Sequence, residues 1–448
     1  MQLSDLNHIT RTTKNWANVL VLDTGSVIDA EAEAMLQALH SRSAGWIQNH
    51  LQVLAEKWAD NFMSKFYVGY GHKSIGDCGT VTVFIEGVSQ LVCKAIQDTK
   101  LYSGQEVSTR YVDFSQQPFI DPSKSETWKA ILEEERAFYL SLLPELNIHF
   151  QNTFPRWEDQ SETIYQKAIA AKAFDVARGF LPTAASSNLA WHTNLRQLSD
   201  RLLYLRHHPL VEVREVAEAI EDAMIEKYPN SFSDVRFEET ENYMEEAMKE
   251  YYFHEHISEF QVKYDKLDVP QLKKAETLHL INSRPNGKTE LPARFNNIGM
   301  IAFQFQLDFW SFRDVQRHRS TFQRMPLLTD ELGFNQRYLS QLPPSLQEKA
   351  QQYLVGLKQR IDSLGLEKEQ KQYYLPMGYN ISCELAGTLP SLAYVCEIRT
   401  SQTVHPTLRK IAQKMSQYLM DTHQIKLFVD MSEYAFDIKR GEQDITSK

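Results

Sequence analysis

The stretch MIAFQFQLDF, residues 300–309, alternates large apolar residues with small or polar ones. The large residues are Ile301, Phe303, Phe305 and Leu307. A period of two predicts a β-strand with one buried face. GTVTVFIEG, residues 79–87, shows a similar pattern in the first half of the chain. The two strands indicate a repeated unit, and such a repeat determines the fold class.

Further features recur in the same order after each strand. An Arg-Tyr pair, a long helix, a Leu-Pro pair and a final helical stretch follow one another in both halves. The pairs are Arg110-Tyr111 and Leu181-Pro182 in the first half, and Arg337-Tyr338 and Leu375-Pro376 in the second. Residues 228–256 begin with turn-forming residues and then become acidic, which is typical of a domain boundary followed by a connecting helix. We therefore expect two domains, residues 1–240 and 241–448.

Apolar residues at helical spacing predict two core-facing helices, one around Phe138 and one around Met415. The first set is Trp128, Ile131, Leu132, Phe138 and Leu142, with Glu135 at the same spacing. The second set is Leu408, Ile411, Ala412, Met415 and Leu419. The chain is therefore expected to mix helices with strands.

The composition excludes several functional classes. The 448 residues are 42% hydrophobic and 24% charged, with a formal net charge of −10. This acidity argues against non-specific nucleic-acid binding, so an anionic ligand needs a localised basic site. No apolar run reaches membrane-spanning length, and residues 1–14 lack the apolar core of a signal peptide. We expect a cytoplasmic protein that binds neither membranes nor nucleic acid.

The cysteines and histidines predict no metal site. The cysteines lack CxxC spacing, so buried thiols are expected. They are Cys78, Cys93, Cys383 and Cys396. For His207, His208 and His405, no second histidine or carboxylate stands at metal-ligand spacing, so these side chains are assigned to the surface or to packing.

SGQEVSTRYVDF, residues 103–114, has the side chains expected of a polar binding loop. If the stretch is extended, Glu106, Ser108 and Arg110 lie on one face. The arginine offers a fork to phosphate or a carbonyl, and the serine and glutamate complete a hydrogen-bonding surface. An isolated solvated loop is the alternative.

These motifs resemble, in order and spacing, the flavin-dependent thymidylate synthases, whose signature pairs an Arg-His-Arg triplet with a downstream Ser-x-Arg-Tyr. In the first half they are GHKSIGDCGTVTVFIEGVS, SGQEVSTRYVDF, ARGFLP and TNLRQL, starting at residues 71, 103, 177 and 193. In the second half they are QRHRS, NQRYL and SLAYVCEIR, starting at residues 316, 335 and 391.

The resemblance implies an α+β fold with two tandem synthase-like domains, each a mixed sheet packed with long helices. It implies a homodimer equivalent to the four-unit assembly of single-unit relatives. The implied reaction converts dUMP to dTMP, with FAD as cofactor and with methylenetetrahydrofolate and NADPH as cosubstrates. The flavin performs the hydride chemistry, and the protein binds, orients and polarises.

The first half matches only part of the family's site. The implied flavin contacts are His72, Ser74, Asn194 and Arg196, with Asp77 in place of the usual glutamate. The implied nucleotide contacts are Glu106, Ser108, Arg110 and Arg178. The triplet falls on Asp98, Thr99 and Lys100. An aspartate beside flavin and nucleotide is unfavourable without compensation, so this half lacks the cations of a complete site.

The second half has the opposite losses. Arg317, His318 and Arg319 form an intact triplet for flavin, and Arg399 matches the arginine against pyrimidine and flavin. The Gly-His-x-Ser motif is absent from residues 286–297. Asn335 replaces the serine, Gln372 replaces the arginine before Leu-Pro, and Thr388, Leu389 and Pro390 replace Asn-x-Arg.

The two motif sets are complementary, and the family's sites lie at subunit interfaces. We therefore infer composite sites in which the loop around Ser108 holds a uracil nucleotide against Arg317 and Arg399. Those three residues are the predicted catalytic set, and Arg317 and Arg399 also bind substrate.

A non-catalytic or differently specific flavin- or nucleotide-binding relative is the alternative. Asp314, and Ala95 in the first half, stand where the family has a glutamine, which leaves the contacts to the base open. Arg206 lies one residue too far from Arg196 to match Arg399 and is interpreted as structural.

Overall fold

The computed structural model describes residues 8–22, 29–34, 73–107, 112, 114–122, 125–158, 160–286 and 289–433. Two compact units are present. Unit 1 comprises Met1–Ser123 and Ala184–Tyr251, and unit 2 comprises Lys124–Thr183 and Tyr252–Lys448. The division after Tyr251 lies near the expected boundary at residue 240, whereas residues 124–183 belong to unit 2 with most of the second half.

In its described residues, unit 1 is built on a five-stranded sheet with the order β1-β2-β3-β5-β4. Its elements are β1 (His8–Thr12), β2 (Asn18–Leu22), η3 (Lys73–Asp77), β3 (Thr80–Ser89), α3 (Gln90–Gln97), β4 (Ser103–Glu106), β5 (Ser186–Asn194), α6 (Leu195–Leu205), α7 (Val211–Lys227) and α8 (Glu238–Met248). Polar caps make the turn from strand to helix. Ser89 accepts a hydrogen bond from Val92 N at the start of α3, and Asn194 accepts one from Gln197 N at the start of α6.

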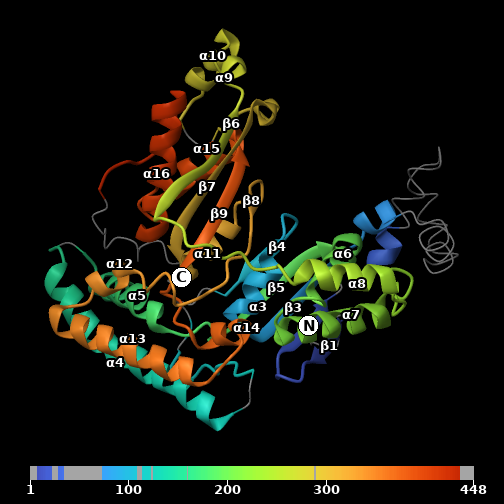
Figure 1. Ribbon diagram of the computed structural model, residues 1–448, viewed down its shortest axis with the longest axis horizontal. Helices are drawn as coiled ribbons and strands as arrows, with labels where there is room; N and C mark the ends of the chain where they lie inside the picture. The colour runs from blue at the N-terminus through green and yellow to red at the C-terminus, as the bar shows by residue number, and fades with distance from the viewer. Residues whose placement is uncertain are drawn as a thin grey trace. The chain divides into compact units, whose positions relative to one another are not determined.

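Unit 2 contains a four-stranded sheet with the order β6-β7-β9-β8. Its strands are β6 (Phe260–Leu267), β7 (Gly299–Asp308), β8 (Phe322–Gln323) and β9 (Asn380–Thr388). The helices from the second half are α9 (Val269–Leu272), α10 (Ala275–Ser283), η6 (Ala293–Ile298), α11 (Phe309–Gln316), α12 (Gln336–Ser340), α13 (Pro344–Ser363), α14 (Lys368–Lys371), η7 (Gln372–Tyr374), α15 (Leu389–Arg399) and α16 (Pro406–His423). Figure 1 shows α15 and α16 beside this sheet.

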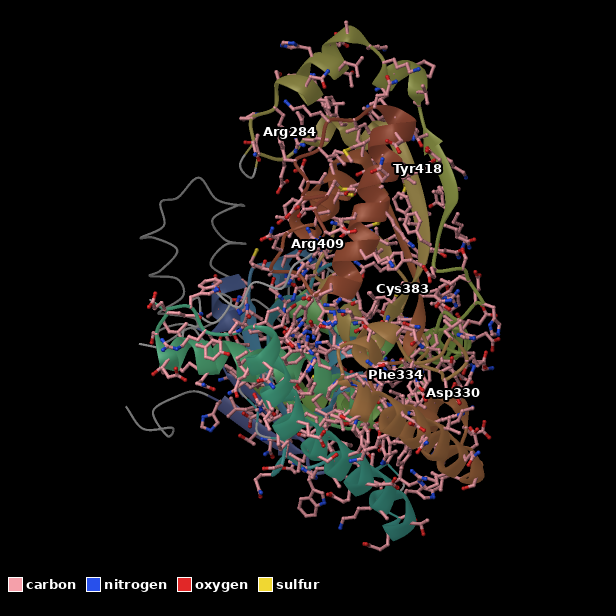
Figure 2. All side chains as sticks on the ribbon, turned by 90° about the vertical axis from the view of Figure 1, so that its left-hand side faces the viewer. Arg284, Asp330, Phe334, Cys383, Arg409 and Tyr418 are labelled. Carbon is pink, nitrogen blue, oxygen red and sulfur yellow. The ribbon has the colours of Figure 1, made fainter. Side chains whose placement is uncertain are left out.

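The first half contributes helices to unit 2. They are α4 (Glu126–Thr153), α5 (Glu162–Ala177) and η5 (Arg178–Phe180). Helix α4 packs beside α13 (Figure 1), where Glu134 pairs with Arg360 and Phe138 stacks on Tyr353. Figure 2 labels Asp330 and Phe334 near α13, and Asp330 accepts a hydrogen bond from Lys358 of that helix. The expected core positions Phe138 and Met415 are 8% and 1% exposed, which confirms both helical predictions.

The chain order of elements repeats. The strands β2-β3-β5-β4 and β6-β7-β9-β8 follow the same sheet order, and a helix follows β3, β5, β7 and β9 directly. A long helix and a short 3₁₀ turn precede both β5 and β9. This agrees with the expected order of features in the two halves.

The two Leu-Pro segments pair with each other inside unit 2. Pro182 lies opposite Pro376 in an antiparallel bridge. Thr183 N donates to Leu375 O at 3.2 Å, and Met377 N donates to Leu181 O at 2.9 Å. A rotation that exchanges Pro182 with Pro376 would also exchange these two hydrogen bonds. The two segments are therefore related locally by an approximate twofold axis.

Two sequence expectations need correction. Among the residues that the structure describes, all strand pairs of both sheets are antiparallel, so these sheets are not mixed. The mixed sheet was expected from the family resemblance alone, whereas the direction of each strand depends on where the connection before it returns to the sheet. Strand β7 also has two covered faces, since Gln304 is 3% exposed and Asp308 fully buried.

Partners of the polar face explain the burial of β7. Gln304 Nε2 donates to Glu255 Oε2 at 3.0 Å, and Gln306 Nε2 donates to Ile257 O at 2.8 Å. Asp308 Oδ2 accepts from Tyr338 Oη at 2.8 Å. Because these partners come from distant segments, the period of the strand alone cannot reveal them.

The cysteine expectation holds for three of four thiols. Cys93, Cys383 and Cys396 are buried, and Cys78 is half-buried. Among the helices that the structure describes, none combines the length and apolar character needed to cross a membrane.

Candidate functional site

Three predicted site residues lie outside the described residues: His72, Ser108 and Arg110. Their proposed roles stay predictions. The other predicted residues are divided between the two units.

Unit 2 contains a cationic cluster of Arg317, His318 and Arg399. Arg317 is the C-cap of α11, and Arg399 is the last residue of α15. Arg399 Nε donates to His318 Nε2 at 2.7 Å, and its Nη2 donates to Asp314 O at 2.9 Å. Arg317 is 56% exposed at its side chain, so it presents a positive charge to solvent. Arg319, the third member of the triplet, is half-buried.

His318 is a neutral imidazole at the base of this cluster. Burial first, and then the charges of Arg399 and Arg317, lower the pKa of His318 to about 3. Because Nε2 accepts from Arg399, the ring proton belongs on Nδ1. Nδ1 is buried, with no hydrogen-bond partner among the described residues. The cluster therefore contains a buried N–H donor that a ligand acceptor could satisfy.

Asp314 organises the cations around it. Burial acts to raise the pKa of its carboxyl, but Arg399, Arg313, Arg317 and Arg178 together hold that pKa below its usual value. Arg317 Nε lies 3.6 Å from Asp314 Oδ1. An ionised carboxylate therefore stands where the family resemblance predicts a glutamine, and it reduces the net charge of the cluster.

Arg178, from the first half, lies in unit 2 with this cluster. It is 3% exposed, and its Nη1 lies 3.0 Å from Asp175 Oδ1. Its guanidinium stands 4.7 Å from the ring centre of Trp310 on α11, and Arg313 stands 4.1 Å from the same ring. One predicted nucleotide contact of the first half thus shares a compact unit with the triplet of the second half.

Unit 1 brings the two predicted flavin motifs of the first half together. Arg196 Nε lies 2.7 Å from Asp77 Oδ1, and both side chains are partly exposed. Ser74 is exposed on η3, the same short helix as Asp77. Asn194 uses its side-chain oxygen to cap α6, which leaves its amide nitrogen for other partners.

Glu106 has an intramolecular partner that the sequence did not indicate. It ends β4 and has a side chain 4% exposed, with Oε1 3.7 Å from Nζ of the fully buried Lys94. Gln97 Nε2 also donates to Glu106 Oε2 at 2.8 Å. Lys94 lies on the apolar helix α3, so the sequence pattern did not indicate a functional role for it. A buried lysine nevertheless needs an anionic partner, and Glu106 provides one.

The unfavourable Asp98 is compensated within unit 1. Tyr251 Oη donates to Asp98 Oδ2 at 3.0 Å. Burial raises the pKa of Asp98, while Arg201 and Tyr251 act in the opposite direction. Arg206 pairs with Glu221 and Glu241, in agreement with its structural interpretation.

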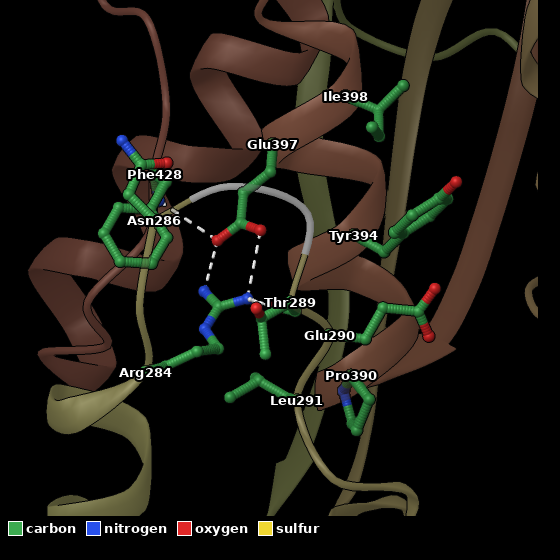
Figure 3. A pocket seen from close by; sticks show the side chains of 10 residues that line it. All are labelled: Arg284, Asn286, Thr289, Glu290, Leu291, Pro390, Tyr394, Glu397, Ile398 and Phe428. Carbon is green, nitrogen blue, oxygen red and sulfur yellow. Dashed lines mark hydrogen bonds and ion pairs between the residues drawn. The ribbon is translucent and has the colours of Figure 1, made fainter.

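Two cavities of unit 2 lie at segments where the sequence lacks motifs that the family resemblance predicts. The first has a volume of about 210 Å³ and is lined by Asn286, Leu291, Pro390 and Tyr394. Figure 3 shows Arg284 paired with Glu397 in this cavity, with Phe428 beside the guanidinium. The first cavity is therefore lined by an internal ion pair and by apolar side chains.

The second cavity measures about 500 Å³ and surrounds the changed Arg-Tyr loop. Asn335 and Arg337 line it together with Lys410 and Lys414. Asn335 caps α12 and donates from Nδ2 to Asn380 Oδ1 at 2.8 Å. Gln372 lies outside this lining, fully buried, where its Oε1 accepts from Leu328 N.

A further cluster escaped the sequence reasoning. His254 and His256 converge with Glu331 in unit 2. The His-x-His spacing was a visible signal, but the carboxylate lies 75 residues further along the chain.

Comparison with known proteins adds an independent line of evidence. Residues 23–230 match the family described as Thy1, thymidylate synthase complementing protein. A flavin-dependent thymidylate synthase of Corynebacterium diphtheriae is 26% identical over 37% of this chain and 64% of its own length.

Longer relatives match nearly the whole chain. A UPF0159 protein of Chlamydia muridarum is 26% identical over 94% of this chain and 91% of its own length. A UPF0159 protein of Thermoplasma acidophilum is 23% identical over 85% of this chain and 90% of its own. These relatives are about twice as long as usual members of the synthase family. Residues 23–230 of this chain are therefore similar to the thymidylate synthase complementing protein family.

Proposed function

We propose that this protein is an FAD-dependent enzyme that methylates a uracil nucleotide, converting dUMP to dTMP with methylenetetrahydrofolate and NADPH. The observation that carries the proposal is the cluster of unit 2, where Arg178 of the first half joins Arg317, His318 and Arg399 of the second. The family match of residues 23–230 supports the reaction class.

The residues of the cluster suit an anionic nucleotide and an electron-poor ring. Arg317 offers an exposed cation for phosphate or a ring carbonyl. Arg399 is fixed by His318 and by Asp314 O, so its charge is preorganised and needs little reorganisation during reaction. The predicted nucleotide loop, with Ser108 and Arg110, supplies the remaining contacts in this proposal.

FAD fits the donors of this chain. The Nδ1–H of His318, which has no partner among the described residues, suits an acceptor on a flavin ring. Arg196 and Ser74 in unit 1 are exposed enough to contact a ligand. Bound FAD would supply the hydride chemistry, while Arg317, His318 and Arg399 would bind and polarise.

We also propose that the chain arose by tandem duplication and that each chain carries one complete set of site residues. The repeated strand order and the twofold-like pairing of the Leu-Pro segments support the duplication. The complementary losses of the sequence motifs support composite sites. The proposed assembly is a homodimer, equivalent to four synthase units.

A differently specific relative is the second candidate, and Asp314 favours it. Its ionised carboxylate replaces a neutral glutamine amide, which removes a donor from the expected base contact. Binding of FAD without turnover of dUMP, but with turnover of another uracil nucleotide, would support this candidate.

Deuterium transfer to dTMP in the presence of FAD, NADPH and methylenetetrahydrofolate tests the proposed reaction. Arg317→Ala is expected to lower the rate about thirty- to a thousand-fold, the scale of one lost stabilising donor. Arg337→Ala in the changed loop is the matched control and is expected to retain activity in proportion to the folded fraction. Full activity of Arg317→Ala would contradict the assigned role of the cluster.

Titration of flavin-free protein with FAD tests the composite model separately. One FAD per chain, or two per dimer, is expected, because each half keeps only part of the motifs. Four equivalent sites per dimer would refute the model even if the enzyme were active.

A further inference from the structure

We propose that His254, His256 and Glu331 form a binding site for a divalent transition metal of the zinc class. The Nε2 atoms of both histidines lie 3.0 Å from the same carboxylate oxygen, Glu331 Oε2. The three ligand atoms all lie within 4.8 Å of one another. Two imidazoles and a carboxylate make up a common three-ligand zinc set.

The distances suit a tetrahedral ion with small adjustments. Zinc lies about 2.0–2.1 Å from such ligands, so the atoms of a tetrahedral site are separated by about 3.3 Å. The two His–Glu separations need to open by about 0.3 Å. The two imidazole nitrogens need to approach by no more than about 1.5 Å, a movement within reach of side-chain rotation.

The backbone presents both histidines on one side. Phe253 N donates to Met325 O at 2.7 Å, and Leu327 N donates to Phe253 O at 2.8 Å. The intervening Glu255 takes the other side, where its N donates to Ser382 Oγ and its carboxylate accepts from Gln304. Residues two apart in an extended segment share a face, so His254 and His256 are held toward Glu331.

Glu331 sits on an anchored loop. The preceding Asp330 accepts hydrogen bonds from Lys358 and Lys371, which fix this part of the chain. In the described part of the chain, the carboxylate of Glu331 pairs with the two imidazoles and with no lysine or arginine. Its negative charge is therefore available to a cation.

The site is open to solvent. The side chains of His256 and Glu331 are 74% and 51% exposed, while that of His254 is 22% exposed. A bound ion would keep a fourth position for water or an external ligand, which is the arrangement of open three-ligand zinc sites. Exchange with the medium is expected to be easy.

Cobalt provides the direct test, with chelator-treated full-length protein that carries no polyhistidine tag. Addition of Co²⁺ at neutral pH is expected to give the absorption of a four-coordinate ion at one equivalent per chain, and Zn²⁺ is expected to displace it. His256→Ala and Glu331→Gln are each expected to weaken binding at least about tenfold, since even outer partners of a metal site contribute that much. The exposed His279 of α10 gives the matched control, His279→Ala, which is expected to bind normally.

Thermal unfolding gives an independent readout. Zn²⁺ is expected to raise the Tm of the wild type, because an ion that binds only the folded state stabilises it. Glu331→Gln is expected to keep the wild-type Tm in chelator but to lose the zinc-dependent rise. Normal Co²⁺ binding by the His256→Ala/Glu331→Gln double variant, or no binding by wild type, would overturn the proposal.

Discussion

Arg399 illustrates how one residue combines charge with fixed geometry. Its Nε and Nη2 donate in two directions, to His318 Nε2 and to Asp314 O. A lysine cannot reproduce a planar fork. We expect Arg399→Lys to lower the free energy of unfolding by about 1–2 kcal/mol through the lost hydrogen bonds. Arg317→Lys, at a position 56% exposed, is expected to change the free energy of unfolding by no more than about 0.5 kcal/mol. Urea titration of both variants measures the two changes.

Glu135 is a residue whose burial opposes folding at neutral pH. It lies on α4, and both carboxylate oxygens are buried without a hydrogen-bond partner among the described residues. Burial first, and then Glu134, raise its pKa well above the ordinary 4.5, although Arg360 acts against them. Below pH 4.5 the acid is neutral in both the folded and unfolded states. As pH rises above 4.5, ionisation favours the unfolded chain.

Replacement of Glu135 tests whether its ionisation destabilises the folded protein. Glu135→Met is expected to raise the free energy of unfolding at pH 7 by about 1–3 kcal/mol, because an apolar side chain needs no partner. The gain should shrink as pH falls toward 4.5. Glu133→Met, a half-exposed position on the same helix, serves as the control. An equal gain at pH 4.5 and pH 7 would show that packing, and not ionisation, produces the effect.

At the scale of elements, close backbone approach joins the two Leu-Pro segments. Gly378 N donates to Gly179 O at 2.8 Å. A Cβ on Gly179 would lie 2.6 Å from the ring of Tyr338. That ring is 1% exposed and its hydroxyl is bonded to Asp308, so it has little freedom to move.

Glycine replacement distinguishes this contact from ordinary helix packing. Gly179→Ala is expected to destabilise unit 2 by about 1–3 kcal/mol through overpacking. Gly356→Ala in α13 meets only the flexible end of Arg360 at 3.1 Å and is expected to be neutral or to gain about 0.5–1 kcal/mol in helix propensity. Urea denaturation of both variants compares the two. If Gly179→Ala were as stable as Gly356→Ala, the paired Leu-Pro segments would tolerate a wider separation.

At the scale of the whole molecule, three histidines with lowered pKa values make the fold sensitive to acid. Burial is the largest cause in each case, and it lowers the pKa of His208 and His318 to about 3 and that of His405 to about 4. Their ordinary value is 6.5. The unfolded chain therefore takes up protons first as pH falls below 6.5, and stability decreases toward pH 4.

The slope of stability against pH measures this effect. Each histidine contributes at most about 1.4 kcal/mol per pH unit within that window. His208→Gln is expected to give a shallower loss of unfolding free energy between pH 6.5 and pH 4, whereas His279→Gln at an exposed position should keep the wild-type slope. An unchanged slope in His208→Gln would mean that its imidazole becomes protonated in the folded protein.

The sequence by itself determined the local elements. Alternation located β3 and β7, and helical spacing located α4 and α16, because backbone geometry fixes periods of two and 3.6. The motif order also indicated the relationship that the family match supports.

Only the tertiary structure decided which distant side chains meet. Arg178 lies against Trp310, Glu106 faces the buried Lys94, and the polar side of β7 finds partners that bury it. His254, His256 and Glu331 converge in the same way. These contacts depend on how separate elements pack, and the need to pair each buried charge or polar group selects the partners only after the chain has folded.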